Sequence, residues 1–125
     1  EAVGPDFLVA LRLGACDYQE GGSTQADAVA ACKIFEAAGI DLLDISGGLC
    51  GYRGDGSKIP GYFGNESQAI REAVSVPVIL TGGVRTGLAA ETLLEEGKAD
   101  LIGVGRSVLK DSSWAKKAFV ELGIE

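Results

Sequence analysis

Histidine and methionine are both absent from the sequence. Without histidine, the chain lacks the side chain most often used for acid–base catalysis near neutral pH. Because the chain starts at Glu1 with no methionine, we expect it to be a piece of a longer protein. The cysteines, Cys16, Cys32 and Cys50, form no CxxC pair, so we predict reduced thiols with neither a metal site nor a disulfide framework.

A basic excess and long apolar runs are missing too. The formal net charge is −7, and the acidic residues are spread along the expected helices, so no face resembles one that binds nucleic acid. No apolar run reaches the roughly 20 residues that a membrane-spanning helix needs, and no signal region follows a charged start. We therefore expect a soluble, cytoplasmic protein that binds neither nucleic acid nor a membrane.

The residues that are present favour one ordered domain over residues 1–125. The hydrophobic content is 46%, which suffices for a buried core in a chain of 125 residues. The chain also has 19 glycines, and these stand at the ends of apolar runs with no fixed period. Such placement is typical of tight turns between regular elements and not of a low-complexity segment.

The apolar pattern alternates between strand and helix periods along the whole chain. The predicted strands cover residues 7–15, 40–45, 77–81 and 100–104, and the predicted helices cover residues 26–38, 66–74, 88–96 and 113–122. Asn65 is the expected N-cap of the second helix, and Gly39 and Gly97 are expected to close the first and third. This order indicates an α/β fold with a parallel sheet, equal to half of an eight-unit barrel. An open doubly wound sheet is less favoured, because no GxGxxG follows the first strand.

Two glycine turns follow the last two predicted strands. Gly82 and Gly83 follow the third, and Gly105 and Arg106 follow the fourth. A strand, a glycine and a helix N-terminus in succession bring free backbone N–H groups and a positive helix end together, which favours an anion. In (β/α)8 barrels, the loops after strands seven and eight build such a phosphate site. We interpret both turns as one phosphate site, with ordinary tight turns as the alternative.

Four segments resemble one enzyme family in order and spacing. LVALRLGACDY, AGIDLLDISGG, VPVILTGGVRTG and ADLIGVGRSVLKDSSWAKKA resemble strands five to eight, with the closing helix, of the Old Yellow Enzyme family of NADH:flavin oxidoreductases. These are FMN-binding (β/α)8 TIM barrels, and the resemblance covers nearly the whole chain. It implies that the chain is the C-terminal half of such a barrel, built from four βα units.

The resemblance also implies roles for particular residues. Backbone amides around Gly82, Gly83, Gly105 and Arg106 would hold the FMN phosphate, and the Arg106 guanidinium would add a charge-assisted contact. Arg12 matches the family arginine at the pyrimidine edge of the flavin, where positive charge stabilises the reduced form. Strand alternation places Arg12 on the same face as the small side chain of Ala10.

The chain departs from the family pattern in what it lacks. The family binds the substrate oxygen with a His/His or His/Asn pair and donates a proton from a tyrosine, and all of these come from the first half of the barrel. We therefore predict no catalytic residue in this chain. NAD(P)H and a small electron-poor alkene are the expected partners of the intact enzyme.

Two other interpretations stay open. The same glycine turns would suit a half barrel that binds a phosphorylated sugar or nucleotide without flavin. Alternatively, the chain is a truncated or engineered half barrel without a ligand that self-associates. A half barrel leaves strand edges and an inner face uncovered, so we also expect a homodimer that completes the barrel.

Other polar and aromatic residues receive weaker interpretations. The glycine-rich segment 46–64 has the length of a functional loop, with its first residues near the ligand. Asp17 and Asp44 have no visible partner and receive no catalytic role, and Trp114 is expected in the core or at an interface. Three tyrosines in glycine-containing loops have two interpretations: they form walls of a flavin pocket, or they pack within their own loops, which we favour. These are Tyr18, Tyr52 and Tyr62.

Overall fold

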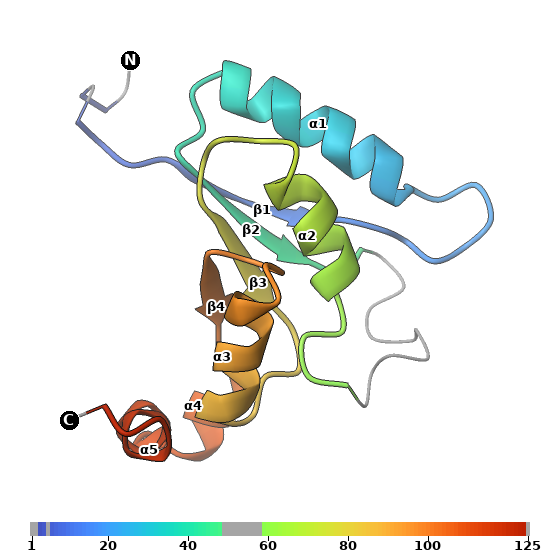
Figure 1. The fold of residues 1–125 in the computed structure, drawn as a ribbon. Coiled ribbons are helices and arrows are strands. Elements are labelled where there is room, and N and C mark those ends of the chain that lie inside the picture. Colours follow the sequence, from blue (N-terminus) through green and yellow to red (C-terminus); the bar gives the residue numbers. More distant parts are fainter. Residues whose placement is uncertain (1–2, 5, 49–58, 125) are drawn as a thin grey trace.

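The strands form one parallel sheet in the order β1-β2-β3-β4 (Figure 1). The computed structural model describes residues 3–4, 6–48 and 59–124, so Cys50, Tyr52 and most of the predicted loop at 46–64 lie outside the described residues. The strands are β1 (Ala10–Gly14), β2 (Leu42–Ser46), β3 (Val78–Thr81) and β4 (Leu101–Gly103). The four predicted strands are thus present, in the parallel arrangement that the alternating pattern indicates.

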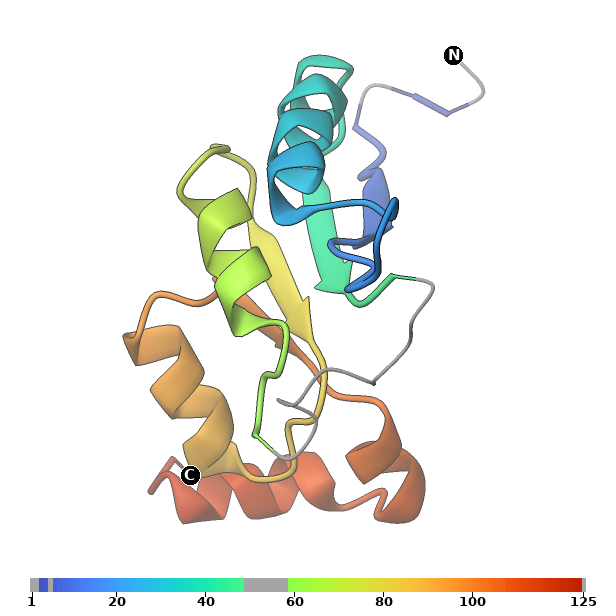
Figure 2. The same ribbon diagram turned by 90° about the vertical axis from the view of Figure 1, so that its right-hand side faces the viewer.

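Among the described residues, three helices cover the same face of the sheet, and two more lie beyond the carboxyl ends of β3 and β4 (Figure 2). They are α1 (Gln25–Ala37), α2 (Gly64–Arg71), α3 (Gly87–Glu95), α4 (Arg106–Lys110) and α5 (Trp114–Glu121). The first three cover the sheet, and α5 packs on α3. Sequence analysis predicted four of these helices and missed α4, because its five residues are too short to show an apolar period.

The predicted boundaries hold at some helix ends and fail at others. Gly39 and Gly97 follow α1 and α3 with φ angles of 94° and 71°, as expected for helix-closing glycines. The prediction that Asn65 caps α2 is wrong, because the helix already begins at Gly64. The buried Phe63 occupies the N-cap position and makes no capping hydrogen bond with its side chain.

The first strand is shorter than predicted. Its ladder with β2 runs only from Ala10 to Gly14, and Phe7 and Leu8 before it are exposed. The prediction followed the run of apolar residues. A strand extends only as far as its hydrogen-bonded partner, so β1 is limited to its ladder with β2. The other three strands begin and end within two residues of their predicted limits.

The two faces of the sheet differ in chemistry. Leu43 and Ile45 of β2, with Val78 and Leu80 of β3, are fully buried beneath the helices. Their neighbours along each strand point to the opposite face, as strand alternation requires. That face carries polar side chains near the carboxyl ends, including Arg12, Asp44 and Thr81. One face therefore forms the core, and the other presents polar groups at one edge.

Two of the cysteines, Cys16 and Cys32, lie among the described residues. Cys16 and Cys32 form no disulfide within the described part of the chain. Cys32 on α1 is fully buried, and burial raises the pKa of its thiol to about 11. The thiol therefore stays protonated at neutral pH and acts as a small apolar side chain.

Aspartates fasten the starts of β2 and β4 to the strands before them. The backbone N–H of Val9 donates to Asp41 Oδ2 at 2.8 Å, and the N–H of Asp41 donates to the Val9 carbonyl at 2.9 Å. Val78 and Asp100 exchange hydrogen bonds in the same way. The Val78 N–H donates to Asp100 Oδ2 at 3.0 Å, and the Asp100 N–H donates to the Val78 carbonyl at 2.9 Å. Arg71 of α2 also donates to Asp100 Oδ1 at 2.8 Å. These contacts fix the register at the amino ends of the strands.

Replacing Asp100 is expected to lower the stability of the sheet in a pH-dependent way. Burial raises the pKa of Asp100, but hydrogen bonds from Arg71 and the Val78 N–H outweigh it and leave the pKa below its usual value. Its stabilising contribution is therefore present above the pKa of the unfolded chain, roughly 4, and is lost as the pH falls through the folded-state pKa. Asp100→Ala should cost about 1–2 kcal/mol in urea unfolding at pH 7.

Asp100→Asn serves as the matched variant, since it keeps an acceptor for the Val78 N–H and removes only the charge. The stability difference between the unsubstituted chain and Asp100→Asn should shrink as the pH falls below about 4. A difference that stays constant down to pH 2 would contradict this assignment.

Candidate functional site

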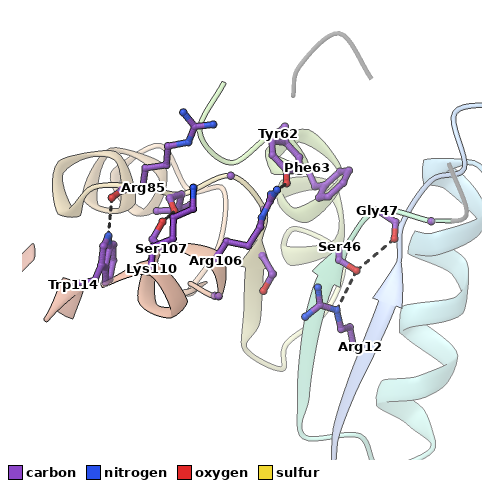
Figure 3. Close-up of a pocket in the computed structure, with 17 residues that line it drawn as sticks. Arg12, Ser46, Gly47, Tyr62, Phe63, Arg85, Arg106, Ser107, Lys110 and Trp114 are labelled. Carbon is purple, nitrogen blue, oxygen red and sulfur yellow. Dashed lines mark hydrogen bonds between the residues drawn. The ribbon is translucent and has the colours of Figure 1, made fainter. Parts of the chain in front are cut away.

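A cavity of about 930 Å³ lies at the carboxyl ends of the strands (Figure 3). This volume is within the range of small-molecule binding sites, roughly 300–1,000 Å³. The residues predicted for the cofactor site all line it, and these are Arg12, Gly82, Gly83, Gly105 and Arg106. Residues that are separated by up to 94 positions in the chain therefore meet in one cavity, as the parallel sheet requires.

The cavity is lined by positive charge although the chain is acidic. Arg85 and Lys110 join Arg12 and Arg106 around it, whereas no aspartate or glutamate is among its described lining residues. The whole chain carries 18 acidic and 11 basic side chains, so four of the 11 cations surround one cavity. Such a local excess attracts an anion.

Unpaired backbone donors accompany the cations. In the part of the chain that the structure describes, the N–H groups of Gly82, Gly83 and Gly105 have no hydrogen-bond acceptor. Backbone N–H groups in folded proteins are nearly always paired with protein or solvent, so three unpaired donors lining one cavity suit an oxyanion. A Cβ built at Gly105 meets nothing within 4 Å, so this stretch of backbone is open to a ligand.

We expected the N-terminus of the helix after the first glycine turn to help bind the anion, and the structure contradicts this. α3 begins at Gly87, four residues after Gly83, and the N–H groups of Gly87 and Leu88 donate to Glu121 Oε2 at 2.7 Å and 3.3 Å. Because a carboxylate already occupies this helix end, the Gly82–Gly83 turn offers its own amides alone. The second turn does open a helix directly, since Gly105 is the N-cap of the short α4.

α4 and α5 hold the loop that follows β3. Ser107 Oγ of α4 donates to the Val84 carbonyl at 2.9 Å. The indole N–H of Trp114 in α5 donates to the Arg85 carbonyl at 2.7 Å (Figure 3). Trp114 packs against a core cluster, as predicted, but its role in fixing this loop was not predicted. Nothing in the linear sequence pairs a tryptophan with a carbonyl 29 residues away.

Tyr62 lines the cavity, which was the less favoured of its two interpretations from the sequence. Arg106 Nη2 donates to the Tyr62 hydroxyl oxygen at 2.7 Å (Figure 3). The Tyr62 ring lies against the first glycine turn, where a Cβ on Gly83 would collide with it. The interpretation that the tyrosines pack within their own loops is wrong for Tyr62, and also for Tyr18, whose hydroxyl donates to Glu66 Oε1 at 2.7 Å. The only available signal was an aromatic residue next to a glycine in a long loop.

Arg12 is held by groups on the neighbouring strand. Its Nη1 donates to Asp44 Oδ2 at 3.0 Å, and its Nε donates to Ser46 Oγ at 3.3 Å. Asp44 received no role in the sequence because no partner was visible, and the structure supplies two, Arg12 and Thr81. Arg12 still exposes 57% of its side chain toward solvent, so it remains accessible to a ligand.

Replacing a glycine by alanine should change the stability of the chain differently in the two glycine turns. Gly83 has a φ of 72°, and its added Cβ would meet the Tyr62 ring, so Gly83→Ala is expected to cost about 1–2 kcal/mol. Gly105→Ala is the control, because its Cβ meets nothing, and its stability should stay within about 0.5 kcal/mol of the unsubstituted chain. Urea unfolding measures both, and equal costs would contradict the described packing at Gly83.

Comparison with known proteins gives consistent matches. The model of a family described as "NADH:flavin oxidoreductase / NADH oxidase family" matches residues 1–124. The chain is 34% identical over 124 residues to an NADH oxidase of Thermoanaerobacter brockii, covering 94% of this chain and 19% of that protein. It is 36% identical over 119 residues to an NADPH dehydrogenase of Bacillus licheniformis, covering 95% of this chain and 34% of that protein.

Among solved structures, a 2-naphthoyl-CoA reductase in complex with 2-naphthoyl-CoA matches with a TM-score of 0.81 and 26% identity. The match covers 97% of this chain and 19% of that chain. The chain therefore spans between about a fifth and a third of the length of these relatives. Together with the four parallel strands, this likeness confirms the predicted half α/β barrel.

Proposed function

Since the chain belongs to the NADH:flavin oxidoreductase / NADH oxidase family, we propose that it is the FMN-binding part of an NAD(P)H-dependent flavin oxidoreductase. Residues 1–125 act in this proposal as one half-barrel unit, equivalent to strands five to eight of the barrel. The backbone amides of Gly82, Gly83 and Gly105 bind the FMN phosphate together with the Arg106 guanidinium. Arg12 lies at the pyrimidine edge of the ring system.

The observation that carries the proposal is the coincidence of unpaired backbone donors and positive charge in one cavity. Three glycine N–H groups without an acceptor in the described chain line the cavity with four basic side chains. A phosphate dianion satisfies the donors and neutralises the charge at once. The cavity also provides room and aromatic surface, from Tyr62 and Phe63, for the apolar part of a flavin.

When bound, FMN supplies the hydride chemistry that links a reduced nicotinamide to an electron-poor alkene. The residues of this chain bind and orient the cofactor and hold positive charge beside it. We assign none of the described residues as proton donor, because the family residues for that step come from the first half of the barrel. NAD(P)H and the alkene are therefore proposed as partners of the longer protein.

FMN should bind the 125-residue chain more tightly than riboflavin, which lacks the phosphate. Arg106→Ala removes a charge-assisted contact of about 1.5–3 kcal/mol, so it should weaken FMN binding roughly 10- to 100-fold. The same substitution should leave riboflavin binding unchanged. Quenching of flavin fluorescence measures both affinities.

Lys116→Ala is the control for a lost positive charge, since Lys116 lies outside the cavity. It should leave the FMN affinity within about twofold of the starting value. A chain that binds phosphorylated sugars or nucleotides but no FMN would contradict the flavin assignment and favour the non-flavin half barrel. Equal binding of FMN and riboflavin would contradict the phosphate site.

We further propose that two copies of the chain associate through the outer strand edges of the sheet. Leu8 before β1 and Leu101 in β4 are 61% and 49% exposed, at the two outer strands of the described sheet. Exposed apolar residues at unpaired strand edges favour pairing with another sheet. Sedimentation of the chain should therefore show a dimer, and Leu101→Lys should shift it to monomer. A stable monomer at micromolar concentration would contradict this arrangement.

A further inference from the structure

A chain of side-chain contacts crosses the sheet on the cavity face. Asp44, in the middle of β2, accepts hydrogen bonds on both carboxylate oxygens. Arg12 Nη1 of β1 donates to Oδ2 at 3.0 Å, and Thr81 Oγ1 of β3 donates to Oδ1 at 2.6 Å. Gly103 of β4 leaves room for the Thr81 hydroxyl, because a Cβ there would collide with it. Three neighbouring strands thus contribute side chains to one network around this carboxylate.

The strand register brings these groups together. Arg12 is the ladder partner of Asp44, so both side chains emerge on the same face. Ser46 lies two residues after Asp44 on that face and accepts from Arg12 Nε at 3.3 Å. The Arg12 guanidinium therefore has two acceptors along β2, and two contacts fix the plane of the group as well as its position.

We propose that Asp44 is a positioning residue for the flavin site: it fixes the Arg12 guanidinium and sets how much positive charge that guanidinium presents to the cofactor. This inference rests on the proposed FMN site. A carboxylate 3.0 Å from a guanidinium offsets part of its field at short range. The site therefore presents less positive charge than a lone arginine would. Because positive charge stabilises reduced flavin, Asp44 lowers the reduction potential of the bound cofactor.

The Arg71–Asp100 pair provides a matched comparison in the same chain. Its ions are 2.8 Å apart and the Asp100 side chain is 34% exposed, against 3.0 Å and 22% for Arg12–Asp44. Neither Arg71 nor Asp100 lines the cavity. Both ion pairs therefore join neighbouring elements of the fold. Only Asp44 is expected to affect the cofactor as well.

Asp44→Asn should raise the midpoint potential of bound FMN, because it removes the negative charge and retains the shape of the side chain. The ratio of affinities for reduced and oxidised FMN should rise about tenfold, which is about 30 mV for a two-electron couple. Asp100→Asn should leave the potential unchanged. A potential that Asp44→Asn does not move, or that both variants move equally, overturns the charge-setting role.

The positioning role has a readout that needs no flavin. The ¹⁵N relaxation of the Arg12 Nε–H should report an ordered group in the unsubstituted chain and in Asp100→Asn, and a mobile one in Asp44→Asn. Thr81→Val is a second variant if Asp44→Asn fails to fold, and it should reduce the order to a smaller extent. Unchanged order in these variants overturns the inference. Failure of the unsubstituted chain to bind FMN contradicts the proposed function and the charge-setting role, and leaves the order of Arg12 as the test of positioning.

Discussion

The parallel register that places β2 between β1 and β3 is the constraint on which the rest of the structure depends. Successive residues of a strand point to opposite faces, so one register decides the core and the site together. In β2, Leu43 and Ile45 fill the core, while Asp44 and Ser46 reach Arg12 on the other face. A shift of one residue would bury Asp44 and expose the two apolar side chains. Stability and ligand chemistry are therefore coupled in this sheet.

The shape of the cavity depends on side chains that are small or missing. Gly83 leaves room for the Tyr62 ring, and Gly103 leaves room for the Thr81 hydroxyl. Ser107 and Trp114 then fix the loop after β3 through its carbonyl groups. Because these contacts exist within the chain itself, the backbone donors of the glycine turns are held in place by packing. Such preorganisation lowers the entropy cost of binding an anion.

The fold could be predicted well from the sequence, because alternating apolar periods and glycine-closed helices are local signals. The meeting of the five predicted site residues could also be anticipated, since the strand ends of a parallel sheet lie together, and all five line one cavity. Their role in binding a cofactor stays a prediction. Contacts between residues that are far apart in the sequence could not be predicted. Asp44 with Arg12, Tyr62 with Arg106 and Glu121 with the start of α3 are separated by more than 30 positions each. Only the three-dimensional structure shows that Glu121 already occupies the end of α3.

The central claim is that three amides without an acceptor among the described residues bind the FMN phosphate together with the surrounding cations. Backbone NMR of the chain during titration with FMN tests it most directly. The account predicts that the amide signals of Gly82, Gly83 and Gly105 shift together and saturate, and that inorganic phosphate moves the same signals at higher concentration. Signals of these glycines that stay unchanged while FMN binds elsewhere, or while no FMN binds, would contradict it.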